Sequence, residues 1–384
     1  MAKTGQPQRG ALALLGAMFL LSATGTRPAQ AQTYSVLNTF TGADGENPWG
    51  LIRDSSGNFY GTTLLGGASS DGVVYELNTA GTETLLHSFT GTDGAYPTAG
   101  MTRDTAGNLY GTATGGASVY GEVFELDAAG TLSVLHSFTG GTDGGNPNGG
   151  LIRDSAGNLY GTTNGGGASG HGVAFMLDAA GTETVLHNFG GAGGGNPIAG
   201  LYRDSAGNLY GTTEGGGAAG FGVVFKLSTT GTEKVLYSFK GGADGANPHA
   251  ALIRDSAGNF YSTTYRGGTG FGTVFMLSAA GTETVLYSFT GGADGTNPST
   301  ALVRDSAGNL YGTTQYGGTG FGVVFKVDTA GTETVLHTFT GGTDGGNPQA
   351  ALFRNAAGDL YGTTYYGGIR QGAGGDGVVF KLVP

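Results

Sequence analysis

The sequence predicts an all-β fold: a seven-bladed β-propeller of four-stranded blades, closed by the N-terminal strand, which completes the last blade. A segment close to GNLYGTT recurs seven times, with its tyrosine at Tyr60, Tyr110, Tyr160, Tyr210, Tyr261, Tyr311 and Tyr361. A period of about 50 residues is typical of propellers and solenoids. Each unit carries four strand-like segments, and four strands per blade is the usual composition of a propeller.

The unit at 149–189 shows how each element is assigned. Segments 149–154, 158–163, 173–178 and 182–189 are rich in Val, Leu, Phe, Tyr and Thr, which favours strands. The turns DSAGN and DAAGT connect the first strand to the second and the third to the fourth, because Asp, Asn and Gly are turn formers. A glycine-rich loop, 164–172, connects the second strand to the third.

The two ends of the repeat array are complementary parts of one unit. Residues 33–40, TYSVLNTF, match a fourth strand such as TETVLHSF, whereas 352–384 supply only the first three strands. We therefore expect residues 33–40 to complete the seventh blade. A solenoid would need polar capping repeats instead, and the sequence contains none.

Composition excludes several other classes of protein. The 384 residues include 81 glycines and no cysteine, so disulfide scaffolds and thiolate metal sites are excluded. The glycines follow no G-X-Y register, which excludes collagen. The net charge of −11 disfavours nucleic acid as a partner.

Residues 1–31 are predicted to be a signal peptide. Lys3 and Arg9 precede an apolar run over 11–23, and Ala29-Gln30-Ala31 follows, which together are typical of an export signal with its cleavage site. The run is too short to span a bilayer of about 30 Å. We expect residues 32–384 to form a single exported propeller, periplasmic or extracellular, monomeric and without a membrane anchor.

One known family shares this repeat. The unit at 302–339 reads LVRDSAGNLYGTT, then GG, then GFGVVFKVDTAGTETVLHTF, and it resembles the units of the GloVer tandem-repeat proteins, which are exported bacterial proteins. The resemblance covers all of 32–384. It implies fold and location, and it implies no activity.

Positions that repeat in nearly every unit are interpreted as scaffold. The arginine of the first strand recurs seven times, from Arg53 to Arg354. It forms either an anion-binding ring or, as we favour, ion pairs with the acids of the loop motif DGxNP, such as Asp143. That motif offers oxygen ligands for calcium, but it is also a common turn. The fourth-strand histidines alternate with Tyr237, Tyr287 and Asn38, which is typical of packing positions, so we expect no metal and no cofactor.

Positions that differ between units gather at one end of each blade. The two tight hairpins lie at one end, here named the hairpin face, and the longer loops after the second and fourth strands lie at the other, the loop face. Loop-face positions next to the predicted channel diverge, whereas the equally exposed hairpin turns do not. Because propellers hold function on loops, we predict a ligand site there, formed by Trp49, Asn148, Asn164, Glu214, His249, Tyr265, Arg266, Gln315, Tyr316, Gln349, Tyr365 and Tyr366.

The predicted site is rich in aromatic rings and amides, which suits a glycan or an extended peptide. A binding or surface-interaction module is the function that we favour. One alternative is a lyase or hydrolase in which Glu214 and His249 form an acid–base pair, assisted by Arg266. The other is a structural envelope protein without a discrete ligand. No residue is assigned as catalytic.

Overall fold

The computed structural model describes residues 1–2, 5, 32–368 and 374–384. It divides into residues Met1–Ala31 and Gln32–Pro384, and the fold is that of the second unit. The predicted signal peptide lies almost wholly outside the described residues. No helix in the described part of the chain has the length and apolar character needed to cross a membrane.

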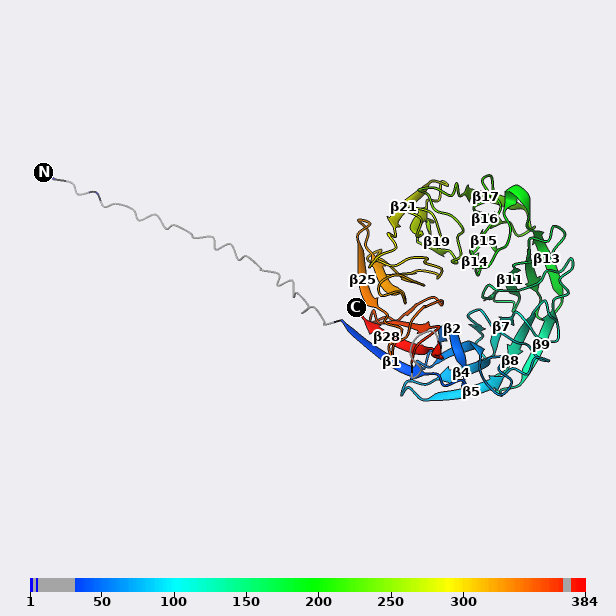
Figure 1. Ribbon diagram of the computed structural model, residues 1–384. Helices are drawn as coiled ribbons and strands as arrows, with labels where there is room; N and C mark the ends of the chain where they lie inside the picture. The colour runs from blue at the N-terminus through cyan, green and yellow to red at the C-terminus, as the bar shows by residue number, and fades with distance from the viewer. Residues whose placement is uncertain (3–4, 6–31, 369–373) are drawn as a thin grey trace. The chain divides into compact units, whose positions relative to one another are not determined.

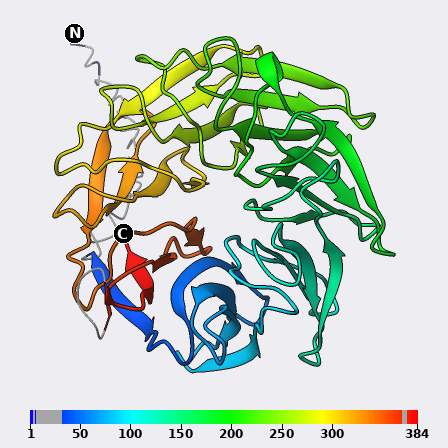
Figure 2. The same cartoon turned by 45° about the vertical axis from the view of Figure 1, so that its right-hand side comes forward.

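Within the described residues of this unit, 28 strands form seven four-stranded antiparallel sheets, arranged as blades around a ring (Figures 1 and 2). This confirms the predicted seven-bladed propeller. Blades 1 to 3 consist of β2 (Glu46–Arg53), β3 (Phe59–Leu65), β4 (Val73–Leu77) and β5 (Glu83–Ser88); β6 (Thr102–Arg103), β7 (Leu109–Ala113), β8 (Glu122–Leu126) and β9 (Leu132–Ser137); and β10 (Ile152–Arg153), β11 (Leu159–Thr163), β12 (Val173–Leu177) and β13 (Glu183–Asn188).

Blades 4 to 6 continue in the same order. They consist of β14 (Tyr202–Arg203), β15 (Leu209–Thr213), β16 (Val223–Leu227) and β17 (Glu233–Ser238); β18 (Ile253–Arg254), β19 (Phe260–Thr264), β20 (Thr273–Leu277) and β21 (Glu283–Ser288); and β22 (Val303–Arg304), β23 (Leu310–Thr314), β24 (Val323–Val327) and β25 (Glu333–Thr338). A short 3-10 helix, η1 (Gly191–Gly193), precedes blade 4.

Blade 7 closes the ring as the sequence predicts. It contains β26 (Phe353–Arg354), β27 (Leu360–Thr364), β28 (Val378–Val383) and, as its fourth strand, β1 (Thr33–Thr39). β1 pairs antiparallel with β28, from Thr33 opposite Val383 to Thr39 opposite Val378. Figures 1 and 2 show β1 beside β28, with blade 1 next to them.

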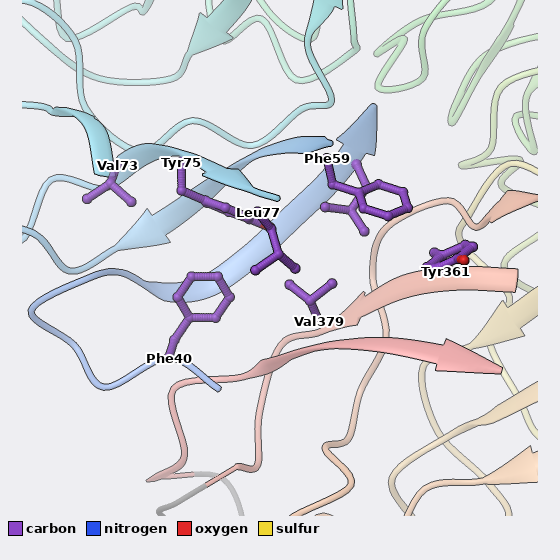
Figure 3. Close-up of a cluster of buried hydrophobic side chains, with 8 residues drawn as sticks. Phe40, Phe59, Val73, Tyr75, Leu77, Tyr361 and Val379 are labelled. Carbon is purple, nitrogen blue, oxygen red and sulfur yellow. The ribbon is translucent and has the colours of Figure 1, made fainter. Parts of the chain in front are cut away.

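The core lies between neighbouring blades. A phenylalanine after each fourth strand packs on an aromatic ring of the next blade, as in Phe138 on Phe175, whose ring centroids are 5.1 Å apart. Figure 3 shows the same contact where the ring closes, with Phe40, Tyr75 and Val379 in one cluster. Gly161 allows this packing, because a Cβ there would stand 2.6 Å from the Phe175 ring.

Local turn chemistry explains the hairpin face. Asp154 accepts hydrogen bonds through Oδ1 from the backbone N–H groups of Ala156 and Asn158, and Gly157 takes a positive φ of 94°, as such turns require. The second hairpin packs against the first, since Ala128 N donates to Asn108 Oδ1 in blade 2.

In five of the seven blades, the asparagine of the DGxNP motif links the blade to the one before it through its side chain. Asn247 has a φ of 53°, and its Nδ2 donates to the carbonyl of Glu214, at the end of the second strand of blade 4. Asn47 makes the same bond to Tyr365 across the closure, at 2.7 Å. These bonds fix the loop face as one rigid frame for the candidate site.

Candidate functional site

A cavity of about 510 Å³ lies at the centre of the ring, on the loop face. The residues that follow the loop prolines line it in every blade: Trp49, Thr98, Asn148, Ile198, His249, Ser299 and Gln349. Small residues such as Ala250 and Ala251 follow them and form the wall. The seven variable positions therefore converge on one space.

Blades 4 to 6 contribute a charged corner. His249 Nε2 lies 3.4 Å from Glu214 Oε1 and has no hydrogen-bond partner of good geometry among the described residues. Contact with His249 lowers the pKa of Glu214, burial opposes this, and Arg266 adds a weaker attraction. The carboxyl group of Glu214 is therefore ionised at neutral pH.

A chain of contacts holds this corner in place. The His249 ring stacks on Tyr265 with centroids 4.4 Å apart, and the Arg266 guanidinium lies 6.0 Å from the centre of the same Tyr265 ring. Tyr265 donates its hydroxyl to Gln315 Oε1, and Gln315 Nε2 donates to Ser299 Oγ. Burial raises the pKa of Tyr265, so its hydroxyl stays protonated.

Blades 7 and 1 contribute an aromatic corner. The rings of Trp49 and Tyr365 meet edge to face at 6.5 Å, and Tyr366 meets Tyr365 at 4.7 Å. The indole Nε1 of Trp49 is buried without a hydrogen-bond partner in the described structure. Such donors are uncommon in folded proteins, and the Trp49 side chain itself lines the cavity.

The twelve residues predicted for the site do not form a single cluster. Trp49, Asn148, His249, Gln315 and Gln349 line the cavity, whereas the other seven do not. Gln349 Nε2 donates to Asn347 Oδ1, and Asn148 accepts a bond from Thr98. Asn164 binds Asn196 instead, as part of the link between blades 3 and 4, and Tyr316 lies 46% exposed.

Sequence reasoning missed a set of rings further from the channel. Tyr120, Phe221 and Phe271 are 44%, 39% and 41% exposed, and they belong to the glycine-rich loop of the loop face. Their position, two residues before the third strand, also varies between units, with Asp71, His171 and Asp376 in other blades. This variation between units was the signal by which the sequence could have indicated these residues, although the exposure of their rings cannot be read from the sequence.

The predicted ion pairs between first-strand arginines and DGxNP acids are wrong. Instead, the guanidinium of Arg153 lies 5.4 Å from the centre of the Tyr110 ring in the preceding blade, and most of the equivalent arginines do the same. Arg203 with Asp154, at 3.7 Å, is the one arginine ion pair within the described residues. The loop acids instead accept hydrogen bonds from their own loops, as Asp44 does from Thr41.

The fold and the convergent cavity define the class of protein: a seven-bladed β-propeller built from tandem repeats. The chain belongs to the Gloeobacter/Verrucomicrobia repeat family, whose model matches residues 15–204 and 193–380. This confirms the resemblance drawn from the repeat motif. No curated protein sequence matches the chain significantly.

Solved structures share the fold at low sequence identity. Virginiamycin B lyase from Staphylococcus aureus is 9% identical with a TM-score of 0.63, and the match covers 92% of this chain and 99% of the lyase. A catalytically inactive variant of that lyase with quinupristin is 11% identical, with a TM-score of 0.62 and the same coverage. The extracellular domain of a candidate one-component system from B. thetaiotaomicron is 10% identical, with a TM-score of 0.60, over 89% of this chain and 39% of that one.

Proposed function

We propose that this protein is an exported binding module whose loop face recognises a glycan or an extended peptide. One observation carries the proposal: seven equivalent positions, occupied by seven different residues, converge on a single cavity. A purely structural ring has no need of such diversity, because the hairpin turns of the same blades stay nearly uniform.

The aromatic corner is expected to supply the main anchor. Flat rings bind sugars or peptide side chains by stacking, and Trp49 lines the cavity in which such a ligand would lie. Polar groups around the rest of the cavity, including Asn148 and Gln349, are neutral donors and acceptors that fix orientation.

A glycan and peptide array tests this proposal, followed by titration of each hit. Trp49→Ala and the double change Tyr365→Ala/Tyr366→Ala are expected to weaken binding about thirtyfold, which corresponds to about 2 kcal/mol for an aromatic anchor. Ala156→Ser and Ala180→Ser on the hairpin face are the matched controls. A hit that responds to the controls and ignores Trp49 would place the site elsewhere, and the absence of any hit would favour a structural envelope role.

The charged corner favours a second candidate function, that of a lyase or hydrolase. Glu214 orients His249 at 3.4 Å, so the imidazole can act as general base or acid toward a ligand in the cavity. The Glu214→Gln variant then binds the array hit as wild type does but loses its turnover. Equal turnover in wild type and Glu214→Gln would exclude this chemistry.

A further inference from the structure

The glycine-rich loops present one side chain per blade at a position whose backbone carbonyl takes part in the scaffold. In blades 4 to 6 this residue is Phe221, Phe271 or Phe321. Each carbonyl accepts a hydrogen bond from the asparagine N–H of the next blade, at 2.9, 2.9 and 2.6 Å. The carbonyl of Asp71 accepts an equivalent bond in blade 1, so the fold requires no particular side chain here.

The three phenylalanine rings are seated against glycine. A Cβ added to Gly241, Gly291 or Gly341 would stand 2.4 to 2.6 Å from the ring of Phe221, Phe271 or Phe321, respectively. Each ring is thus held against backbone, while Phe271 keeps 41% and Phe221 39% of its surface exposed. Rigid, partly exposed rings of this kind are preorganised for contact with a partner.

The exposed apolar surface is concentrated on the loop face. Among the described residues, ten large hydrophobic side chains are exposed, and six of these belong to loops of this face: Tyr96, Val119, Tyr120, Phe221, Phe271 and Tyr316. Asp71, His171 and Asp376 show that a blade tolerates a polar residue at the phenylalanine position. Phe221 and Phe271 are therefore exposed rings at a position where folding tolerates a polar residue, whereas Phe321 also packs in part against the hydrophobic cluster of blades 6 and 7.

We propose that Phe221, Phe271 and Phe321 form a strip that extends the loop-face site outward and binds a neutral polysaccharide chain by stacking on its sugar rings. The inference rests on the proposed binding function and names its ligand class. The rings occur singly, one per blade, which suits a ligand with a repeating flat unit. A lipid or a protein hot spot would instead need one continuous apolar patch.

Charge favours a neutral chain over an acidic one. The whole sequence carries a net charge of −11, which repels polyanions at long range. On the loop face of blades 5 and 6, Tyr265 donates its hydroxyl to Gln315, and Gln315 lines the cavity. A bound chain would therefore run from the strip to the central cavity, with its end near His249.

The test uses the full protein and neutral gluco-, xylo-, manno- and chito-oligosaccharides, each as a disaccharide and as a hexasaccharide. Wild type is expected to bind one series, and its hexasaccharide at least tenfold more tightly than its disaccharide. Phe221→Ala/Phe271→Ala is expected to remove this advantage and to leave disaccharide binding unchanged. Leu85→Ala is the matched control, because Leu85 is 43% exposed but lies on the outer strand β5. Thermal melting confirms that each variant is folded.

The outcomes separate this inference from the proposed function. Equal affinity for both lengths, with binding lost in Trp49→Ala, would overturn the strip and leave the central site standing. Binding of array peptides that depends on Phe221 and Phe271 would overturn the polysaccharide class. If wild type binds no oligosaccharide and no array member, both proposals fail.

Discussion

At the residue scale, Tyr75 departs from the pattern of the core. The other six blades carry phenylalanine at its position: Phe124, Phe175, Phe225, Phe275, Phe325 and Phe380. Tyr75 is fully buried, and its hydroxyl has no hydrogen-bond partner in the described residues. An unsatisfied buried hydroxyl destabilises a fold by about 1–3 kcal/mol.

Tyr75→Phe is therefore expected to raise the free energy of unfolding by about 1 kcal/mol, measured by urea denaturation. The reverse change in another blade, Phe225→Tyr, is the control and should destabilise the protein. A lower urea midpoint for Tyr75→Phe would mean that the hydroxyl makes a stabilising contact.

At the element scale, the seams between outer strands hold carboxyl groups in pairs. Glu283, at the start of β21, lies beside Asp244, which accepts a hydrogen bond from Tyr237 of the preceding blade. Burial, with a further contribution from Asp244, raises the pKa of Glu283 to about 7. Glu333 has the same surroundings, with Asp294 and Tyr287, and its pKa is also raised to about 7.

These raised pKa values predict that stability falls as pH rises. A carboxyl group whose pKa is higher in the folded state stabilises the fold fully below its ordinary pKa of 4.5, and this stabilisation is lost as pH rises through about 7. We expect a lower melting temperature at pH 8 than at pH 5.5, with a smaller difference in Glu283→Gln/Glu333→Gln.

A seam that lacks the aspartate supplies the control for this pH dependence. Gly193 replaces it beside Glu233, which lies 3.5 Å from His187, so Glu233→Gln removes a carboxyl group without removing such a pair and serves as the matched variant. At lower pH the aspartates of the first hairpin affect the stability of the fold in the opposite direction. Hydrogen bonds outweigh burial and lower the pKa of Asp154 and Asp255, so stability falls again as pH drops through their range. A melting temperature that rises steadily to pH 8 would contradict the paired-carboxyl account.

The strands could be predicted because the same turn residues recur in every unit. The side-chain contacts between neighbouring blades were harder to predict. Asp154 and Gly157 mark the same turn wherever they recur, so local sequence was sufficient. The arginine contacts were predicted wrongly, because the partner of Arg153 is Tyr110 in the preceding blade. Nothing in the local sequence specifies which groups of two blades meet.

At the scale of the whole molecule, ring closure brings together residues from opposite ends of the chain. The contact of Trp49 with Tyr365 followed from the predicted closure, and the structure places them edge to face. The proposed Phe221–Phe321 strip did not follow from the sequence, because the variation at this position does not say which side chains are exposed. Only the structure shows that Phe221 and Phe271 keep 39% and 41% of their surface exposed.

Deleting 33–40 is expected to abolish soluble monomer and to lower the melting temperature strongly. Blade 7 would keep three strands and leave the edge of β28 unpaired, and exposed edges promote aggregation. Size-exclusion chromatography and thermal melting measure both effects. An unchanged thermal transition would show that β1 contributes nothing to closure.

The pairing of β1 with β28 also determines when the molecule can finish folding. Blades 1 to 6 are each made from consecutive strands, whereas blade 7 joins the first strand of the described chain to the last. Two strands that lie so far apart in the sequence pair slowly, and β28 is the last strand of the chain to be synthesised. Completion of the ring therefore depends on the last strand of the chain: a chain that lacks β28 leaves β1 without its partner and the last blade with an open edge.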